Sequence, residues 1–173
     1  YLLPGGRLQS FLAVEELTGM APLHEVIPEL AARLPAADFE QWKRQLIVDL
    51  ARLVRALHDR RFFHKDLYLC HFYLPTPKPP AAARRETLHM IDLHRLGFHP
   101  WSFAIWQVKD LAQLVYSSQI AGISARDRLR FWRCYWDGAR RGRWANILRR
   151  LILMKWSLYR RHNLKRKING AKP

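Results

Sequence analysis

The stretch FFHKDLYLCHFYL, residues 62–74, places two histidines, a lysine and an aspartate in an otherwise aromatic and aliphatic run. Polar side chains in such a run cost free energy unless hydrogen bonds, opposite charges or a ligand satisfy them. The three with the most chemical capacity are His64, Asp66 and His71. We therefore expect a polar loop with a specific role, anchored by its apolar neighbours.

The segment before this loop has the pattern of a long amphipathic helix. Asp38 with Gln41 three residues later has the spacing of a capping box, and apolar residues follow at helical intervals up to His58. Other elements are expected as a strand over 9–16, a helix over 22–34, a strand over 88–93, helices over 105–119, 124–136 and 144–159, and a fraying tail. The chain is predicted to be one α+β domain, mostly helical.

Positive charge is concentrated in the last quarter of the chain. Residues 1–125 carry 14 Lys and Arg against 12 Asp and Glu, whereas residues 126–173 carry 16 against 2. Such a field favours a polyanionic partner, which would be nucleic acid, an anionic lipid surface or a phosphorylated glycan. The alternative is a solvated basic helix face without a fixed partner.

The cysteine count and the distribution of apolar residues indicate the cellular compartment. Two cysteines are too few for a disulfide framework and indicate a reducing environment. No apolar run approaches the length needed to span a bilayer, and the first residues lack the layout of a signal peptide. We expect a protein that is soluble or peripheral to a membrane.

Two polar segments stand in an order that resembles two motifs of protein kinases. The kinase catalytic loop reads H-R-D-L-x-x-x-N, and the metal-binding aspartate follows a strand as D-F-G. Here His64 and Asp66 match, Lys65 replaces the arginine, and His71 stands at the asparagine position. Asp92 ends the predicted strand after the loop, at the place of the metal-binding aspartate.

The chemistry of phosphoryl transfer explains why these residue types are needed. A hydroxyl that attacks the γ-phosphoryl group of ATP needs a carboxylate to accept its proton, which is the role predicted for Asp66, with His64 beside it. Mg²⁺ neutralises the developing charge, and Asp92 and His71 are its predicted ligands. Asp110, near the start of the next predicted helix, is expected to steady the catalytic loop, as in kinase-like folds. The alternative for Asp66 and Asp92 is that they are aspartates of surface turns without a catalytic role. The alternative for Asp110 is an ordinary negative charge at a helix N-terminus.

The spacing of the aspartates bears on the acceptor. Only 17 residues separate Asp92 from Asp110, and no A-P-E motif lies between them. A protein kinase needs a longer segment there to dock a polypeptide. The sequence therefore favours the hydroxyl of a small molecule or glycan as acceptor.

A known family shares these features. FFHKDLYLCHFYL and MIDLHRL resemble the catalytic loop and metal motif of the bacterial lipopolysaccharide kinase (Kdo/WaaP) family, and FLAVEEL resembles the segment between two kinase lobes. The resemblance extends over residues 11–118. It implies a protein-kinase-like fold, and phosphorylation of a heptose or Kdo sugar of the lipopolysaccharide inner core with ATP and Mg²⁺.

The same resemblance implies roles for further residues. The backbone around Glu15, Glu16 and Leu17 would contact the adenine of ATP, and His71 would face both nucleotide and metal. Ten residues precede the matching segment, too few for the glycine-rich loop, strand lysine and helix glutamate of a complete kinase. We therefore expect a C-terminal lobe with little or no N-terminal lobe, and little kinase activity from this chain alone.

Within that single domain, residues 1–19 are expected to be the last N-lobe strand and the linker, and residues 126–173 the basic C-terminal helices. An inner-core acceptor is an anionic glycolipid at the cytoplasmic face of the inner membrane, and basic helices fit a peripheral contact there. The arginines expected at this contact are Arg140, Arg141, Arg143, Arg149, Arg150, Arg160 and Arg161. The interleaved aromatic residues, Trp144, Trp156 and Tyr159, are expected in the core.

Two other function classes fit parts of the sequence. A metal-dependent hydrolase would use His64, Asp66, His71, Asp92 and His94 as ligands. A non-enzymatic nucleic-acid binder would use the basic tail, although no nucleic-acid motif accompanies it and the tail does not explain the paired aspartates.

Overall fold

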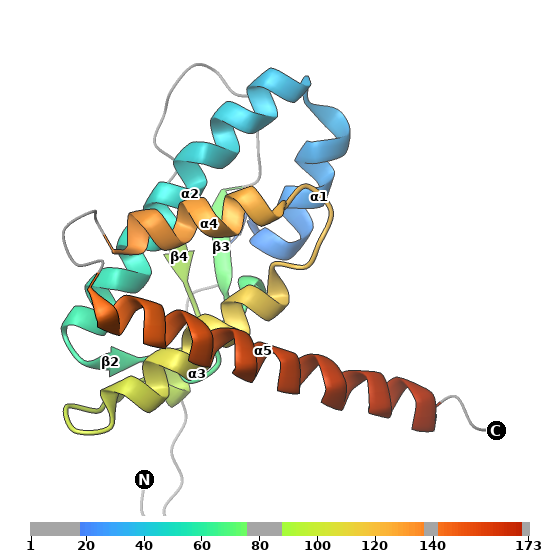
Figure 1. Ribbon diagram of the computed structural model, residues 1–173. Helices are drawn as coiled ribbons and strands as arrows, with labels where there is room; N and C mark the ends of the chain where they lie inside the picture. Colours follow the sequence, from blue (N-terminus) through green and yellow to red (C-terminus); the bar gives the residue numbers. More distant parts are fainter. Residues whose placement is uncertain (1–17, 76–87, 137–141, 171–173) are drawn as a thin grey trace, which may run out of the picture.

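The computed structural model of the chain describes residues 18–75, 88–136 and 142–170, with side chains of the last helix described as far as residue 162. The α-helices in these ranges are α1 (Leu23–Arg33), α2 (Ala36–Asp59), α3 (Phe103–Ser117), α4 (Ala125–Tyr135) and α5 (Arg143–Gly170). The strands are β1 (Met20–Pro22), β2 (Phe62–Phe63), β3 (Phe72–Pro75), β4 (His89–Met90) and β5 (Gly97–Phe98), with single 3₁₀ turns η1 (Leu69–His71) and η2 (Leu93–Arg95). The predicted α+β, mostly helical architecture is confirmed (Figure 1).

The long helix α2 forms as predicted, but its start differs. The helix begins at Ala36, directly after Pro35, and no side chain caps it. The predicted capping box of Asp38 and Gln41 is therefore wrong. Proline has a fixed φ that is compatible with a helix start. Asp38 lies instead in the first turn, where a negative charge is favourable to the helix dipole.

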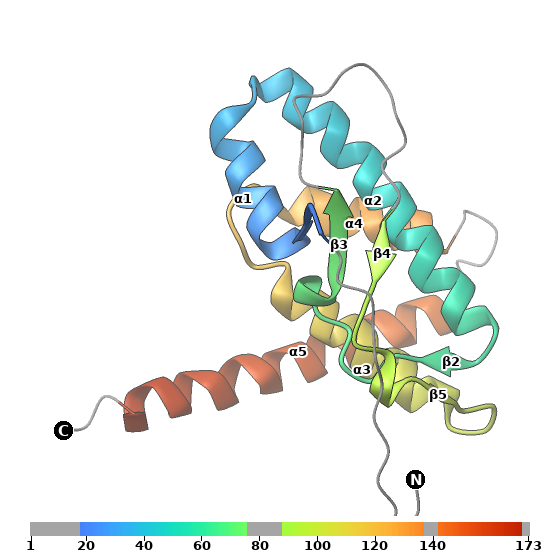
Figure 2. The same ribbon diagram turned by 180° about the vertical axis from the view of Figure 1, so that it is seen from behind.

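Two small antiparallel sheets bring the two sequence motifs together. β1, β3 and β4 form one sheet in the order β1-β3-β4, and β2 pairs with β5 in the other. In the register of the first sheet, Phe72 pairs with Met90 and Tyr73 with His89. Figure 2 shows β3 and β4 side by side, with β2 close to the end of α2. The loop after β2 and the turn after β4 consequently meet.

The strand predicted over 88–93 is shorter in the structure. Only His89–Met90 has strand geometry, because the backbone of Asp92 adopts the left-handed conformation with φ 61°. Aspartate is one of the few residue types that visit this region without glycine's freedom. The chain then makes the η2 turn.

The last helix is longer than predicted and lies against α3. α5 continues to Gly170, so the fraying expected after residue 159 is wrong for the backbone. In both views it extends beyond the rest of the described chain (Figures 1 and 2). Although α5 has 28 residues, none of the helices in the described ranges has the apolar length needed to cross a membrane.

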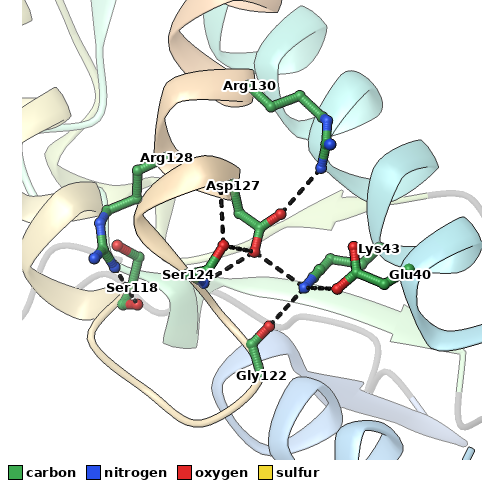
Figure 3. Close-up of polar contacts among 8 residues, drawn as sticks. All are labelled: Glu40, Lys43, Ser118, Gly122, Ser124, Asp127, Arg128 and Arg130. Atoms are coloured by element: carbon green, nitrogen blue, oxygen red, sulfur yellow. Dashed lines mark hydrogen bonds and ion pairs between the residues drawn. The ribbon is translucent and has the colours of Figure 1, made fainter. Parts of the chain in front are cut away.

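A buried ion pair joins α2 to α4. Lys43 Nζ lies 3.0 Å from an oxygen of Asp127, and both side chains are about 5% exposed or less. Lys43 also donates to Gly122 O at 2.9 Å and pairs with Glu40 (Figure 3). Ser124 and Asp127 form a capping box at the start of α4, which confirms the helix start predicted at residue 124. Burial acts to raise the pKa of Asp127, but bonds from Ser124 and Lys43 outweigh it, so the pKa is lowered.

We expect Asp127→Ala to lower the free energy of unfolding by about 3 kcal/mol at pH 7, because it leaves a buried ammonium group with less compensation. Urea denaturation followed by circular dichroism measures this loss. Arg130→Ala is the matched control: Arg130 contacts the same carboxylate at 3.0 Å but is one-third exposed, so its removal should cost less than about 1 kcal/mol.

The same variant should show the sign of the pKa shift. A carboxyl whose pKa is lowered by folding stabilises the folded state above its unfolded pKa of 3.8, and the effect is lost as pH falls through the lower folded value. The difference between the wild-type chain and Asp127→Ala should therefore shrink at low pH. A difference unchanged between pH 7 and pH 3 would contradict the ion pair.

Candidate active site

A buried carboxylate on α3 holds the loop that carries Asp66. Asp110 has no exposed area, and its Oδ2 and Oδ1 accept hydrogen bonds from the backbone N–H groups of His64 and Lys65 at 2.9 and 2.8 Å. The expected position near the helix start is wrong, since α3 begins at Phe103 and Asp110 lies two turns inside it. A helix-terminus role is thereby excluded, and the carboxylate is bonded to the loop that it was expected to steady.

Three residues that the sequence analysis missed complete this anchor. His58, at the end of α2, contacts Asp110 Oδ2 through Nε2 at 3.3 Å and the Tyr135 hydroxyl through Nδ1 at 2.8 Å. Gln107 donates to the same hydroxyl at 2.6 Å. Burial raises the pKa of Tyr135, so its phenol keeps its proton and can donate to His58. A polar side chain on the apolar face of the predicted helix was the only signal for His58.

Asp66 follows the anchored residues and reaches the surface. Its carboxylate is 23% exposed, with Oδ2 paired to Arg95 and Oδ1 accepting from Gln113 Nε2 at 3.3 Å. Gln113 Oε1 also accepts from the Leu67 N–H at 3.1 Å. Gln113 stands one turn after Asp110 on α3, so one helix face fixes both the loop backbone and the Asp66 side chain. Neither Arg95 nor Gln113 was predicted.

His71 links the two motifs. Its Nδ1 lies 2.7 Å from the backbone carbonyl of Asp66, and its Nε2 lies 3.4 Å from Asp92 Oδ2. Because a carbonyl can only accept, Nδ1 carries a proton, and in the neutral ring Nε2 then has a free lone pair. That lone pair and the Asp92 carboxylate converge, as they would on a shared cation.

His64 lies beneath this pair, away from solvent. It is fully buried, its Nε2 lies 2.9 Å from the Ile91 carbonyl, and its ring stacks on His71 with centroids 5.4 Å apart. The Ile91 N–H in turn donates to the His71 carbonyl at 2.9 Å. His64, predicted as catalytic, is thus placed where it positions His71 and the strand end before Asp92 and cannot touch a substrate.

The predicted hydrolase ligands are only partly brought together. His94 contacts Asp92 through Nδ1, but the Nε2 of His64 is used by a backbone carbonyl. In the described ranges, no three or more His, Cys, Asp and Glu side chains are grouped as they would be around a metal ion. The predicted nucleotide residues Glu15, Glu16 and Leu17, together with the predicted strand 9–16, lie outside the described residues.

Comparison with known proteins agrees with this geometry. Residues 4–135 match the model of the lipopolysaccharide kinase (Kdo/WaaP) family. The chain belongs to this family. It is 37% identical over 129 residues to the lipopolysaccharide core heptose(I) kinase WaaP of Pseudomonas aeruginosa. The matched segment covers 75% of this chain and 47% of that kinase. It is 34% identical over 128 residues to WaaP of Escherichia coli K12, with 73% and 46% covered.

A solved structure shows the same fold. WaaP in complex with acyl carrier protein superposes with a TM-score of 0.61 at 33% sequence identity, covering 87% of this chain and 57% of that one. The chain spans about half the length of the curated Kdo/WaaP relatives it matches.

We expect Asp110→Ala to release the loop that carries Asp66, because two backbone donors lose their acceptor. In hydrogen exchange, the amide protons of His64 and Lys65 should lose protection by more than about tenfold, while those of α2 keep theirs. Asp59→Ala, which removes an exposed carboxylate paired with Arg55, serves as the control. Asp110→Asn keeps one acceptor oxygen and should lie between; unchanged loop protection in both variants would show that other contacts hold the loop.

Proposed function

We propose that this chain carries the catalytic part of an ATP-dependent kinase that phosphorylates a heptose or Kdo hydroxyl of the lipopolysaccharide inner core. The observation that carries the proposal is the Asp66 carboxylate, partly exposed on a loop whose backbone is bonded to the buried Asp110, with Asp92 across His71. The heptose(I) kinase names of the relatives support the acceptor class.

In this proposal Asp66 is the general base. Its carboxylate accepts the proton of the acceptor hydroxyl while the hydroxyl oxygen forms a bond to the γ-phosphorus of ATP. The bond from that phosphorus to the β-γ bridging oxygen breaks, and ADP leaves with the electron pair. Gln113 fixes the orientation of the carboxylate through Oδ1 and through the Leu67 N–H.

Asp92 and His71 are the proposed cation ligands. A carboxylate oxygen suits Mg²⁺, which is held in proteins by one or two carboxylates together with substrate phosphates. The Nε2 lone pair of His71 is a softer ligand than the asparagine oxygen of protein kinases. A bound divalent cation would neutralise negative charge that develops on the phosphates. The backbone around Glu15, Glu16 and Leu17 is the proposed adenine contact.

The surface of α5 supports a peripheral contact with the cytoplasmic face of the inner membrane. Five of its apolar side chains lie three or four residues apart and are 36–60% exposed, so they form one stripe along the helix. These residues, here called the apolar stripe, are Trp144, Ile147, Leu151, Met154 and Leu158.

Charge indicates what the apolar stripe contacts. α5 contains no Asp or Glu, and Arg149, Arg150, Arg160 and Arg161 are exposed on it. A second copy of so basic a helix would be repelled, whereas an anionic lipid surface attracts both its arginines and its apolar side chains. The predicted core positions of Trp156 and Tyr159 agree with their partial burial, whereas the core position predicted for Trp144 is wrong, since its side chain is 40% exposed on the outer face of α5. Arg140 and Arg141 lie outside the described residues.

We expect Asp66→Asn to lower the rate of phosphoryl transfer by at least about a hundredfold, because the amide cannot accept the proton. The measurement is transfer of phosphate from ATP to isolated core oligosaccharide by the full-length protein, with circular dichroism as the check of folding. Asp49→Asn, on the distant surface of α2, is the control. A rate within a few-fold of wild type would exclude Asp66 as the base.

We expect Leu151→Gln with Met154→Gln to weaken binding of the chain to vesicles that contain anionic lipid by about tenfold, since two exposed apolar side chains that would enter the lipid are lost. Vesicle co-sedimentation measures it. Leu153→Gln is a matched control, because Leu153 is 48% exposed but lies off the apolar stripe. Equal losses from Leu153→Gln would mean that general hydrophobicity, and not the stripe, determines binding.

A further inference from the structure

Three tyrosines from three segments stand beside the proposed base, Asp66. Tyr68 belongs to the loop that carries this aspartate, Tyr116 to α3 and Tyr159 to α5. The rings of Tyr116 and Tyr159 are in edge contact, with centroids 6.3 Å apart. All three side chains are partly exposed. These residues, here called the tyrosine cluster, therefore keep surface that a ligand can contact.

One amide group connects the tyrosine cluster to the proposed base. Gln113 Nε2 donates to the Tyr68 hydroxyl at 3.2 Å and to Asp66 Oδ1 at 3.3 Å. The phenol oxygen and the carboxylate oxygen therefore lie within reach of a single nitrogen. Because the Tyr68 oxygen accepts from Gln113, its own proton can be donated to a ligand. A ligand ring in contact with Tyr68 would thus have its substituents close to the Asp66 carboxylate.

Helix geometry extends the tyrosine cluster from α3 to α5. Gln113 and Tyr116 are three residues apart, so they share the face of α3 that looks toward the loop. Lys155 and Tyr159 are four residues apart on α5, with Lys155 Nζ 5.6 Å from the centroid of the Tyr159 ring. α3 and α5 pack against each other (Figure 1). α5 therefore brings Tyr159 to the side of α3 that faces the loop.

The pKa directions agree with this placement. The pKa of Tyr159 is raised to about 12, mainly by burial and in smaller part by neighbours that include Tyr68 and Asp66. Burial also raises the pKa of Tyr68, while the hydrogen bond from Gln113 lowers it and the charge of Asp66 raises it. The two tyrosines therefore lie near the same carboxylate, and both phenols keep their protons at neutral pH.

Another aromatic ring near the loop is less suited to bind a ligand. Trp106 lies on α3, but the Nζ atoms of Lys65 and Lys109 lie 5.2 and 5.4 Å from its ring centroid. His99 packs on it as well, with the two ring centroids 4.8 Å apart. Trp106 thus has three partners within the fold, which favours the tyrosine cluster as the aromatic surface beside the base.

We propose that the tyrosine cluster is the surface against which the sugar ring of the acceptor lies while Asp66 accepts the proton of its hydroxyl. A sugar ring has an apolar face of C–H groups, which packs on aromatic rings, and a rim of hydroxyl groups, which hydrogen-bond to phenols. The inference rests on the proposed function. It adds the residues that bind the sugar ring, and it makes α5, through Tyr159, a part of the acceptor site as well as the proposed lipid contact.

Tyr159→Ala tests the tyrosine cluster in the full-length protein. With ATP and lipid-free core oligosaccharide, KM for the oligosaccharide should rise about tenfold, the scale of one lost aromatic contact. KM for ATP and kcat should stay within about threefold, because the base and the proposed cation ligands are unchanged. Since this acceptor carries no lipid, weaker membrane contact cannot cause the loss. Leu153→Ala, which truncates a 48% exposed side chain on α5, is the matched control and should change none of these values.

Tyr159→Phe separates the ring from its hydroxyl group. It keeps the aromatic face, so KM for the oligosaccharide should return to within about twofold of wild type. A phenylalanine variant as poor as the alanine variant would overturn packing of the sugar on the ring. A rise in KM for ATP, or a fall in kcat with KM unchanged, would assign Tyr159 to the nucleotide or to support of the loop and would overturn the proposal as well.

A binding experiment without ATP separates the tyrosine cluster from the kinase function. In saturation-transfer nuclear magnetic resonance, irradiation of the aromatic protons of the full-length protein should attenuate the ring C–H signals of the core oligosaccharide, and Tyr159→Ala should weaken the effect at least about threefold. Contact through Tyr159 without phosphoryl transfer once ATP is added would refute the proposed function alone. Phosphoryl transfer with KM and saturation unaffected by Tyr159→Ala would refute the role of the tyrosine cluster alone.

Discussion

The hydrogen bonds between the Asp110 carboxylate and two consecutive backbone N–H groups are the constraint on which the site depends. A buried carboxylate costs free energy unless donors surround it, and here the donors come from the loop that it holds. Lys65 has a φ of 68°, a conformation that turns successive N–H groups toward one anion. The loop and α3 are therefore stable only together, and Asp66 projects from a backbone that cannot easily shift.

Local patterns predicted the parts of the fold that depend on neighbours in sequence. The apolar spacing of α2 and the start of α4 at Ser124 could be predicted because each depends on only a few adjacent residues. The order of the two motifs was also readable, because a short sheet must bring Asp92 back to the loop. The start of α2 was not predicted correctly. The Asp38 pattern indicated a capping box, but the helix begins directly after Pro35, whose fixed φ is compatible with a helix start.

The supporting residues of the site could not be predicted in the same way. His58 and Tyr135 meet across 77 positions of sequence, and Arg95 reaches Asp66 across 29. No periodicity or spacing reports contacts of that kind, because tertiary packing alone creates them. His64 shows the opposite limit: the motif identified the right position, but only burial shows that the ring stacks beneath His71 and does not face solvent.

Helix α3 contacts both the loop that carries Asp66 and helix α5, so it links the site to the basic C-terminal helix. One of its faces holds the loop that carries Asp66 through Asp110 and Gln113, and another packs along α5, which carries the apolar stripe. If α5 rests on lipid as proposed, the height of Asp66 above the bilayer is fixed by one helix. The proposed kinase would then select its acceptor by the distance of the hydroxyl from the lipid anchor, in addition to the shape and charge of the sugar.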